Sequence, residues 1–181
     1  MEDPKFSHWK VGKRILRYIV CTMDYGIRYS TSEDDSLVGY TDTDFASSVD
    51  DRKGTYGYEF MFGTGLISWA SKKQPIITIS SAEAKYVEGP STTCHAIWLR
   101  RILNDITYEE KDLTPMFCEN NSTISLSNNH VFHHKSKHID TSYHFIRDLV
   151  NDGSVMLQIC GLKEQLTYIF TKPLGRNTFE F

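Results

Sequence analysis

The spacing of apolar residues divides the chain into a helical first segment and a longer part in which strands and helices alternate. Apolar residues recur at helical spacing from Trp9 to Met23 with Lys and Arg between them, which predicts an amphipathic helix with a basic outer side. A short strand-like run comes after it at 27–29. The polar stretch 30–36 beyond that run is typical of a boundary between two units.

Three β-prone runs come next. They cover residues 37–42, 56–62 and 66–71, and in the second of them aromatic residues alternate with other side chains from Tyr56 to Phe62. The turn sequence GTG at 63–65 joins the second and third runs. Together the three runs predict an antiparallel meander.

The second half of the chain alternates helical and strand patterns. The sequence SSAE at 80–83 fits a capping box and predicts a helix start, and Pro90 should bend or split this helical stretch, so two helices are expected there. We further predict a strand at 115–118, helices at 120–128 and 140–150, a strand at 155–159 and a helix at 164–170. This order predicts an α/β fold with a five-stranded mixed sheet, an antiparallel meander plus parallel strands, flanked by helices.

Composition narrows the class of protein. The 181 residues, 40% of them hydrophobic, can form one compact domain, and a net charge of −3 excludes a protein that coats nucleic acid by bulk charge. The four widely spaced cysteines suit buried thiols in a reducing compartment. No apolar run is long enough for a membrane span and the start lacks a signal-peptide pattern, so we expect an intracellular protein of cytoplasm or nucleus, without a membrane partner.

Three carboxylates are candidates for a metal site. Asp42 ends the first strand, Glu83 opens the first helix after the meander, and Glu119 ends the fourth strand, so the three could converge beside the central strands. Clustered carboxylates of this kind can hold two Mg²⁺ ions for phosphodiester cleavage. Each also has an ordinary structural explanation, as a turn residue, a helix cap and a charge near a helix start.

Other side chains suggest contacts with nucleic acid. A discontinuous basic surface could follow phosphates, or could be ordinary solvated charge; it comprises Arg52, Lys53, Lys72, Lys73, Lys135 and Lys137. Trp69, Trp98 and the aromatic row at 56–62 fit a core better than platforms for stacked bases. The histidines between 133 and 144 match no common zinc spacing.

A series of ordered blocks resembles one known family almost from end to end. The blocks are HWKVGKRILRY (8–18), GYTDTDFA (39–46), DDRKGTYGY (50–58), ISWASKKQP (67–75), SSAEAKY (80–86), IWLRR (97–101), KHID (137–140), YHF (143–145) and IFTKPL (169–174). In these blocks the chain is similar to the Pol polyproteins of copia-type LTR retrotransposons, from the end of reverse transcriptase through ribonuclease H.

The resemblance implies a ribonuclease H-like fold and a division of the chain. Residues 1–30 would be a remnant of the C-terminal helix of reverse transcriptase, 37–174 the ribonuclease H-like domain and 175–181 a tail. The implied activity is hydrolysis of the RNA strand of RNA/DNA hybrids by two-metal catalysis with Mg²⁺ or Mn²⁺. Asp42 and Glu83 match the first and second catalytic carboxylates of the family.

Two positions depart from the family pattern. The third carboxylate is an aspartate in a Cys-Asp-Asn block, whereas this chain has Glu119, whose extra methylene moves the oxygens by roughly 1.5 Å. The fourth is an aspartate where this chain has Tyr168, a neutral phenol that binds Mg²⁺ poorly. We therefore expect weak or absent cleavage in a diverged or decayed copy.

The resemblance leaves two hypotheses for function. The first is an impaired metal-dependent endoribonuclease that acts on RNA/DNA hybrids through Asp42, Glu83 and Glu119. The second is a catalytically dead, domesticated binding module for a protein or nucleic-acid partner. Asp140 and His144 lie one helical turn apart and could substitute for the missing ligand, although capping and orienting their own helix explains them as well.

Overall fold

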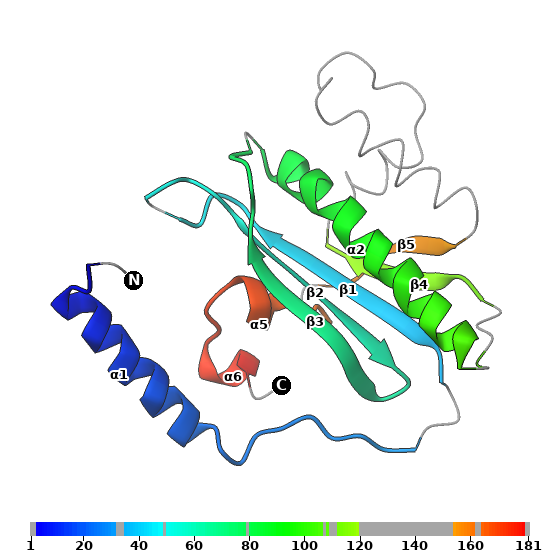
Figure 1. Ribbon diagram of the computed structural model, residues 1–181, viewed down its shortest axis with the longest axis horizontal. Coiled ribbons are helices and arrows are strands. Elements are labelled where there is room, and N and C mark those ends of the chain that lie inside the picture. Colours follow the sequence, from blue (N-terminus) through cyan, green and yellow to red (C-terminus); the bar gives the residue numbers. More distant parts are fainter. Residues whose placement is uncertain are drawn as a thin grey trace.

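The chain forms a five-stranded mixed sheet with helices on both of its faces in a computed structural model (Figure 1). The structure describes residues 3–31, 35–48, 50–78, 80–106, 108, 112–119, 154–161 and 164–179, without the side chains of 82, 83 and 85–88. Helices predicted at 120–128 and 140–150 lie outside these residues. None of the described helices is long and apolar enough to cross a membrane.

The sheet contains the five strands that the sequence predicts. Its strands are β1 (Leu37–Asp44), β2 (Thr55–Phe62), β3 (Gly65–Lys73), β4 (Thr114–Cys118) and β5 (Val155–Ile159). They are arranged in the order β3-β2-β1-β4-β5, with antiparallel pairing from β3 to β1 and parallel pairing from β1 to β5. The prediction of a meander plus parallel strands is confirmed.

The core lies between the sheet and helix α2 (Ser81–Asp105). Buried side chains from four strands meet buried residues of this helix, namely Leu37, Phe60, Met116 and Val155 against Ala96, Leu99 and Leu103. Gly39 permits the close packing, because a Cβ there would overlap the Met116 sulfur. Since side chains alternate along a strand, residues one position away from Gly39 face the opposite side of the sheet.

Helix α2 is continuous through Pro90, so the prediction of two helices is wrong. Proline removes one backbone N–H and bends a helix, but it does not end the helix when packing holds both sides. Here the buried Thr92, Thr93 and Ala96 come soon after Pro90, and the Thr93 hydroxyl donates to the Gly89 carbonyl at 2.8 Å.

The remaining segments differ from the prediction in detail. Helix α1 (Phe6–Cys21) is confirmed, but residues 27–29 form no strand, because the hydrogen bonds near them come from side chains such as the Tyr29 hydroxyl, which donates to the Leu66 carbonyl at 2.7 Å. The helix predicted at 164–170 begins only at Tyr168, as α5 (Tyr168–Thr171). The predicted tail contains a further short helix, α6 (Arg176–Phe179).

Three predictions of burial are also wrong. Trp69 is 55% exposed and Trp98 is 53% exposed, whereas Tyr58 and Phe60 of the aromatic row are buried as expected. Of the four cysteines, Cys21 and Cys94 are exposed, while Cys118 and Cys160 are buried.

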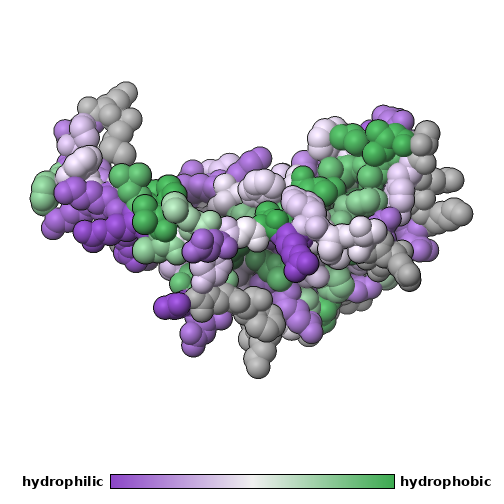
Figure 2. Space-filling view, turned by 90° about the horizontal axis from the view of Figure 1, so that it is seen from below, coloured by the Kyte–Doolittle hydropathy of each residue, from purple (hydrophilic) through white to green (hydrophobic). Residues whose placement is uncertain are grey.

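Helix α1 contains no buried residue, and Figure 2 shows hydrophobic residues exposed beside hydrophilic ones at that end of the molecule.

Candidate active site

The candidate site surrounds Asp42 on the face of the sheet opposite α2. Asp42 is 2% exposed and is paired across the ladder with Gly57 of β2. Gly57 has no side chain to separate the strand from α5, and a Cβ there would lie 2.6 Å from the Phe170 Cβ. This close approach lets residues of α5 reach the Asp42 carboxylate.

One oxygen of the Asp42 carboxylate is engaged by the end of α5. The Thr171 hydroxyl donates a hydrogen bond of 2.5 Å to Oδ2, and the Lys172 ammonium lies 3.5 Å from the same oxygen. The other oxygen, Oδ1, is buried and has no hydrogen-bond partner among the described residues. Oδ2 is therefore paired within the chain, whereas Oδ1 could accept a further hydrogen bond or bind a cation.

Glu119 lies on the same face of the sheet as Asp42. In the parallel β1–β4 pair, Tyr40 is the partner of Phe117, and their rings stack with centroids 5.1 Å apart. Two residues beyond this pair, the same alternation places Asp42 of β1 and Glu119, the residue directly after β4, on one face. Burial, which is the largest effect, and the negative charges of Cys118, Glu119 and Glu164 raise the pKa of the Cys160 thiol to about 11.

Tyr168 opens α5, and the family resemblance leads us to expect an aspartate at this position. The Lys172 ammonium lies 3.6 Å from the centroid of the Tyr168 ring, so the same cation contacts both the ring and Asp42. The site thus has a phenol and an ammonium where a second divalent ion would need an anionic ligand. The α5 side of Asp42 does not fit such an ion.

The side chain of Glu83 lies outside the described residues, although its backbone belongs to the first turn of α2. The possible substitutes Asp140 and His144, and the basic residues Lys135 and Lys137, also lie outside them. Among the side chains that the structure describes, no three His, Cys, Asp or Glu residues group as metal ligands would.

Two buried glutamines hold the site together, and the sequence reasoning missed both. The Gln165 amide donates to the Thr41 carbonyl at 3.0 Å, which fixes the segment before α5 against β1. The Gln74 amide donates to the Ala84 carbonyl at 2.7 Å, which fixes the first turn of α2 near the end of β3. Gln165 lies four residues before the family-like block at 169–174, so no local pattern indicated this contact.

The predicted basic residues gather at the end of the sheet where β1 finishes. Arg52 and Lys53 lie in the β1–β2 connection, and Lys72 and Lys73 are the ladder partners of Tyr56 and Thr55. Two of these cations have partners within the chain, since Lys73 pairs with Asp51 at 2.7 Å and the Lys53 ammonium donates to the Pro75 carbonyl at 2.7 Å. The cluster is therefore only partly available to phosphates.

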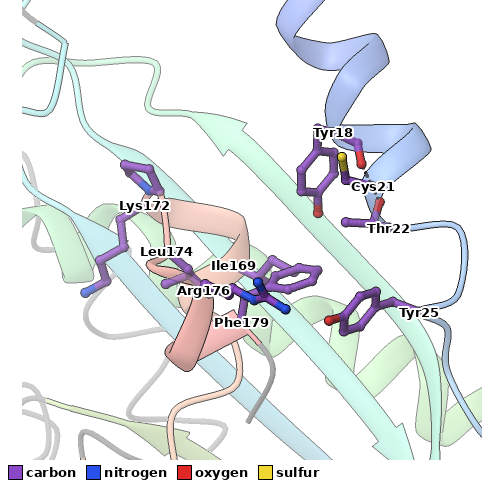
Figure 3. A pocket seen from close by; sticks show the side chains of 10 residues that line it. Tyr18, Cys21, Thr22, Tyr25, Ile169, Lys172, Leu174, Arg176 and Phe179 are labelled. Carbon is purple, nitrogen blue, oxygen red and sulfur yellow. Dashed lines mark hydrogen bonds between the residues drawn. The ribbon is translucent and has the colours of Figure 1, made fainter.

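A pocket of about 550 Å³ lies between the end of α1 and the C-terminal helices (Figure 3). Tyr18 and Tyr25 approach Phe179 with ring centroids 6.0 and 5.3 Å away, and Lys172 belongs to the wall. Lys172 therefore lies between this pocket and the Asp42 carboxylate.

The fold is that of ribonuclease H, as solved structures confirm. The N-terminal RNase H domain of a Mycobacterium tuberculosis protein superposes with a TM-score of 0.53 at 10% identity, over 75% of this chain and 91% of that one. LC11-RNase H1, solved in complex with an RNA/DNA hybrid, gives a TM-score of 0.52 at 10% identity, over 75% and 94% of the two chains. The chain is therefore an RNase H-like domain.

Sequence relatives identify the family. The chain is 38% identical over 180 residues to the retrovirus-related Pol polyprotein from transposon TNT 1-94 of Nicotiana tabacum, and 36% identical to that from transposon RE2 of Arabidopsis thaliana. These matches cover 99% of this chain but 13% and 12% of the polyproteins, and no protein-family model matches. Over almost its whole length the chain is therefore homologous to one segment of copia-type retrotransposon Pol polyproteins.

Proposed function

We propose that this chain binds RNA/DNA hybrids as a ribonuclease H-like domain and cleaves the RNA strand weakly or not at all. The observation that carries the proposal is the environment of Asp42 at α5. A hydroxyl and an ammonium engage Oδ2, and the ammonium also contacts the phenol of Tyr168, which stands where the resemblance implies a fourth carboxylate. Two-metal cleavage requires anionic ligands on both sides of the shared carboxylate.

A divalent ion would fit only on the other side of Asp42. Asp42 Oδ1 is buried without a hydrogen-bond partner among the described residues, and Glu119 follows the neighbouring strand on the same face. Asp42, Glu119 and Glu83 would hold a single Mg²⁺ or Mn²⁺ there. A bound ion would supply Lewis-acid activation of water or of a phosphate oxygen.

An RNA/DNA hybrid is the partner that the site favours. β1 ends two residues beyond Asp42. The basic residues Arg52, Lys53, Lys72 and Lys73 lie at this end of the sheet. Cations in this position could contact the phosphates of a duplex whose backbone passes Asp42. The structural relative LC11-RNase H1 was solved with such a hybrid, which supports the same class of ligand here.

The alternative is a catalytically dead, domesticated module that binds a protein partner. The observation that favours it is the exposure of two large aromatic side chains, Trp69 on the edge strand β3 and Trp98 on α2. Exposed tryptophans are enriched in protein interfaces. In this case the sheet would serve as a scaffold and the Asp42 site would have no substrate.

The test measures binding and cleavage of a labelled RNA/DNA hybrid separately. Binding is followed by fluorescence anisotropy in EDTA, and cleavage is followed in Mg²⁺ and in Mn²⁺. We expect binding by the unaltered protein, little or no cleavage, and gain of cleavage in the double variant Glu119→Asp plus Tyr168→Asp. Asp42→Asn in that double variant is the control and should abolish the gain.

Efficient cleavage by the unaltered protein, lost in Asp42→Asn, would refute impaired catalysis. Failure to bind the hybrid in any condition would instead favour the protein-binding alternative. Because the two measurements respond to different parts of the site, each half of the proposal can fail alone.

A further inference from the structure

The α5 side of Asp42 already contains a positive charge that the chain itself provides. The Asp42 side chain is 1% exposed, and a carboxylate taken out of water needs a compensating charge or hydrogen bonds. The Thr171 hydroxyl supplies one hydrogen bond, and the Lys172 ammonium, 3.5 Å from Oδ2, is the cation nearest to this oxygen among the described residues.

Lys172 is held in place from a second direction. Its ammonium lies 3.6 Å from the centroid of the Tyr168 ring, well inside the range of a cation–π contact. The side chain is only 36% exposed, so the ammonium is partly withdrawn from solvent between the ring and the carboxylate. Tyr168 and Asp42 thus form the two walls of a small cation site.

A divalent ion cannot share this site with the ammonium. Mg²⁺ bound to Oδ2 would lie about 2 Å from that oxygen and therefore within a few ångströms of the Lys172 nitrogen. Repulsion between two positive charges at that separation is strong in a partly buried site. The ammonium and the ion must exclude each other.

We propose that the Lys172 ammonium takes the place of a divalent cation on the α5 side of Asp42, so that the chain binds at most one such ion. This inference deepens the proposed function and rests on it for the identity of the site. Lys172 acts as a positioning residue, because it neutralises Asp42 and attaches α5 to the sheet. The cation–π contact with Tyr168 holds the ammonium at Asp42, so the Tyr168→Asp change of the double variant above would release it.

The test compares Mn²⁺ binding and thermal stability of the full chain and its Lys172→Met variant. Methionine keeps an unbranched side chain as far as Cε and removes the charged nitrogen. Mn²⁺ binding is counted by electron paramagnetic resonance, and Tm is measured in EDTA and in Mn²⁺. We expect the unaltered protein to bind at most one Mn²⁺, and Lys172→Met to bind Mn²⁺ about tenfold or more tightly.

The stability measurement gives a second readout. In EDTA the Tm of Lys172→Met should be about 3 °C or more below that of the unaltered protein, because Asp42 loses its counter-charge. Mn²⁺ should recover this loss in the variant and change the unaltered protein little. Lys172→Arg keeps the charge and should behave as the unaltered protein, and Lys172→Gln gives a second neutral variant if the methionine variant folds poorly.

Lys73→Met is the matched control, since it removes the cation of an exposed pair with Asp51. Its Mn²⁺ affinity should remain that of the unaltered protein. Two Mn²⁺ ions bound by the unaltered protein, or a Lys172→Met variant with unchanged affinity and unchanged Tm, would overturn the inference. Hybrid cleavage is not used in this test, so its outcome is independent of whether the proposed impairment of catalysis holds.

Discussion

Gly57 is the residue at which β2 comes closest to α5. A Cβ at this position would lie 2.6 Å from the Phe170 Cβ and 3.2 Å from a Thr171 methyl group, so α5 must move if a side chain is added. We expect Gly57→Ala to lower stability by about 1–3 kcal/mol, as overpacking usually does. Urea denaturation measures the change.

The control for Gly57→Ala is Gly12→Ala in α1. Nothing lies within 4 Å of a Cβ at Gly12, and alanine favours a helix, so this variant should be neutral or slightly more stable. A Gly57→Ala variant as stable as the unaltered protein would mean that α5 does not press against the sheet at this point.

Glu59 is a second residue whose environment has a measurable consequence. It is 4% exposed between its ladder partners Tyr40 and Trp69, and burial raises the pKa of this carboxyl to about 7. The folded state therefore retains a proton that the unfolded chain loses near pH 4.5. Stability from this group is fully present below pH 4.5 and is lost as the pH rises to about 7.

The expected outcome is that Glu59→Gln stabilises the protein at pH 8 by up to about 3 kcal/mol, since the amide cannot ionise. At about pH 4.5 the variant and the unaltered protein should differ little. Denaturation curves at the two pH values measure this, and equal effects at both would contradict a titrating Glu59.

At the scale of elements, hydrophobic periodicity was sufficient to predict the sheet but not the helix ends. The alternation of residues 56–62 and the apolar run at 115–118 indicate strands directly, because burial on a sheet follows side-chain alternation. Pro90 misled the prediction, because tertiary packing by residues 92–96 maintains the helix where local propensity would end it. Helix α5 is shorter than its pattern suggests, because the Gln165 amide donates to Thr41 of β1 and accepts a hydrogen bond from the Thr167 hydroxyl instead.

The candidate site was predictable only in part. The position of Asp42 at the end of the first strand and the family resemblance made it a candidate, and the placement of Glu119 follows from parallel pairing of β1 and β4. The contact of Lys172 with Asp42 joins residues 130 positions apart in the sequence, so no local pattern could indicate it. Gln74 was missed because a buried glutamine has no periodic signal.

Gln74 connects two elements, and its removal should loosen α2. Its side chain is 1% exposed and its amide donates to the Ala84 carbonyl in the first turns of α2. We expect Gln74→Ala to cost about 1–3 kcal/mol, because the Ala84 carbonyl loses its donor in a buried place. Gln158→Ala is the control, since Gln158 is less buried and bonds only weakly to Met156. Equal Tm values for the two variants would show that Gln74 does not support the helix.

At the scale of the whole molecule, α1 stands apart from the RNase H-like body. It contains no buried residue, while many of its apolar side chains are exposed (Figure 2). We propose that residues 1–30 are a unit distinct from the domain at 37–174. This unit would be a remnant of the C-terminal helix of reverse transcriptase. Tyr18 near the end of α1 and Tyr25 beyond it lie close to Phe179 (Figure 3).

This division predicts that removal of residues 1–24 leaves the stability of the body almost unchanged. The shortened chain keeps Tyr29 and Ser30, whose side chains bond to Leu66 and Thr64 beside the β2–β3 turn. We expect the Tm to change by no more than about 2 °C, because α1 contains no buried residue and little apolar area is lost with it. Tyr29→Ala in the full chain should lower the Tm more, since Gly65 packs directly against the Tyr29 ring. If the shortened chain instead unfolded, α1 would belong to the same cooperative unit as the sheet, and its exposed apolar face would not mark a boundary.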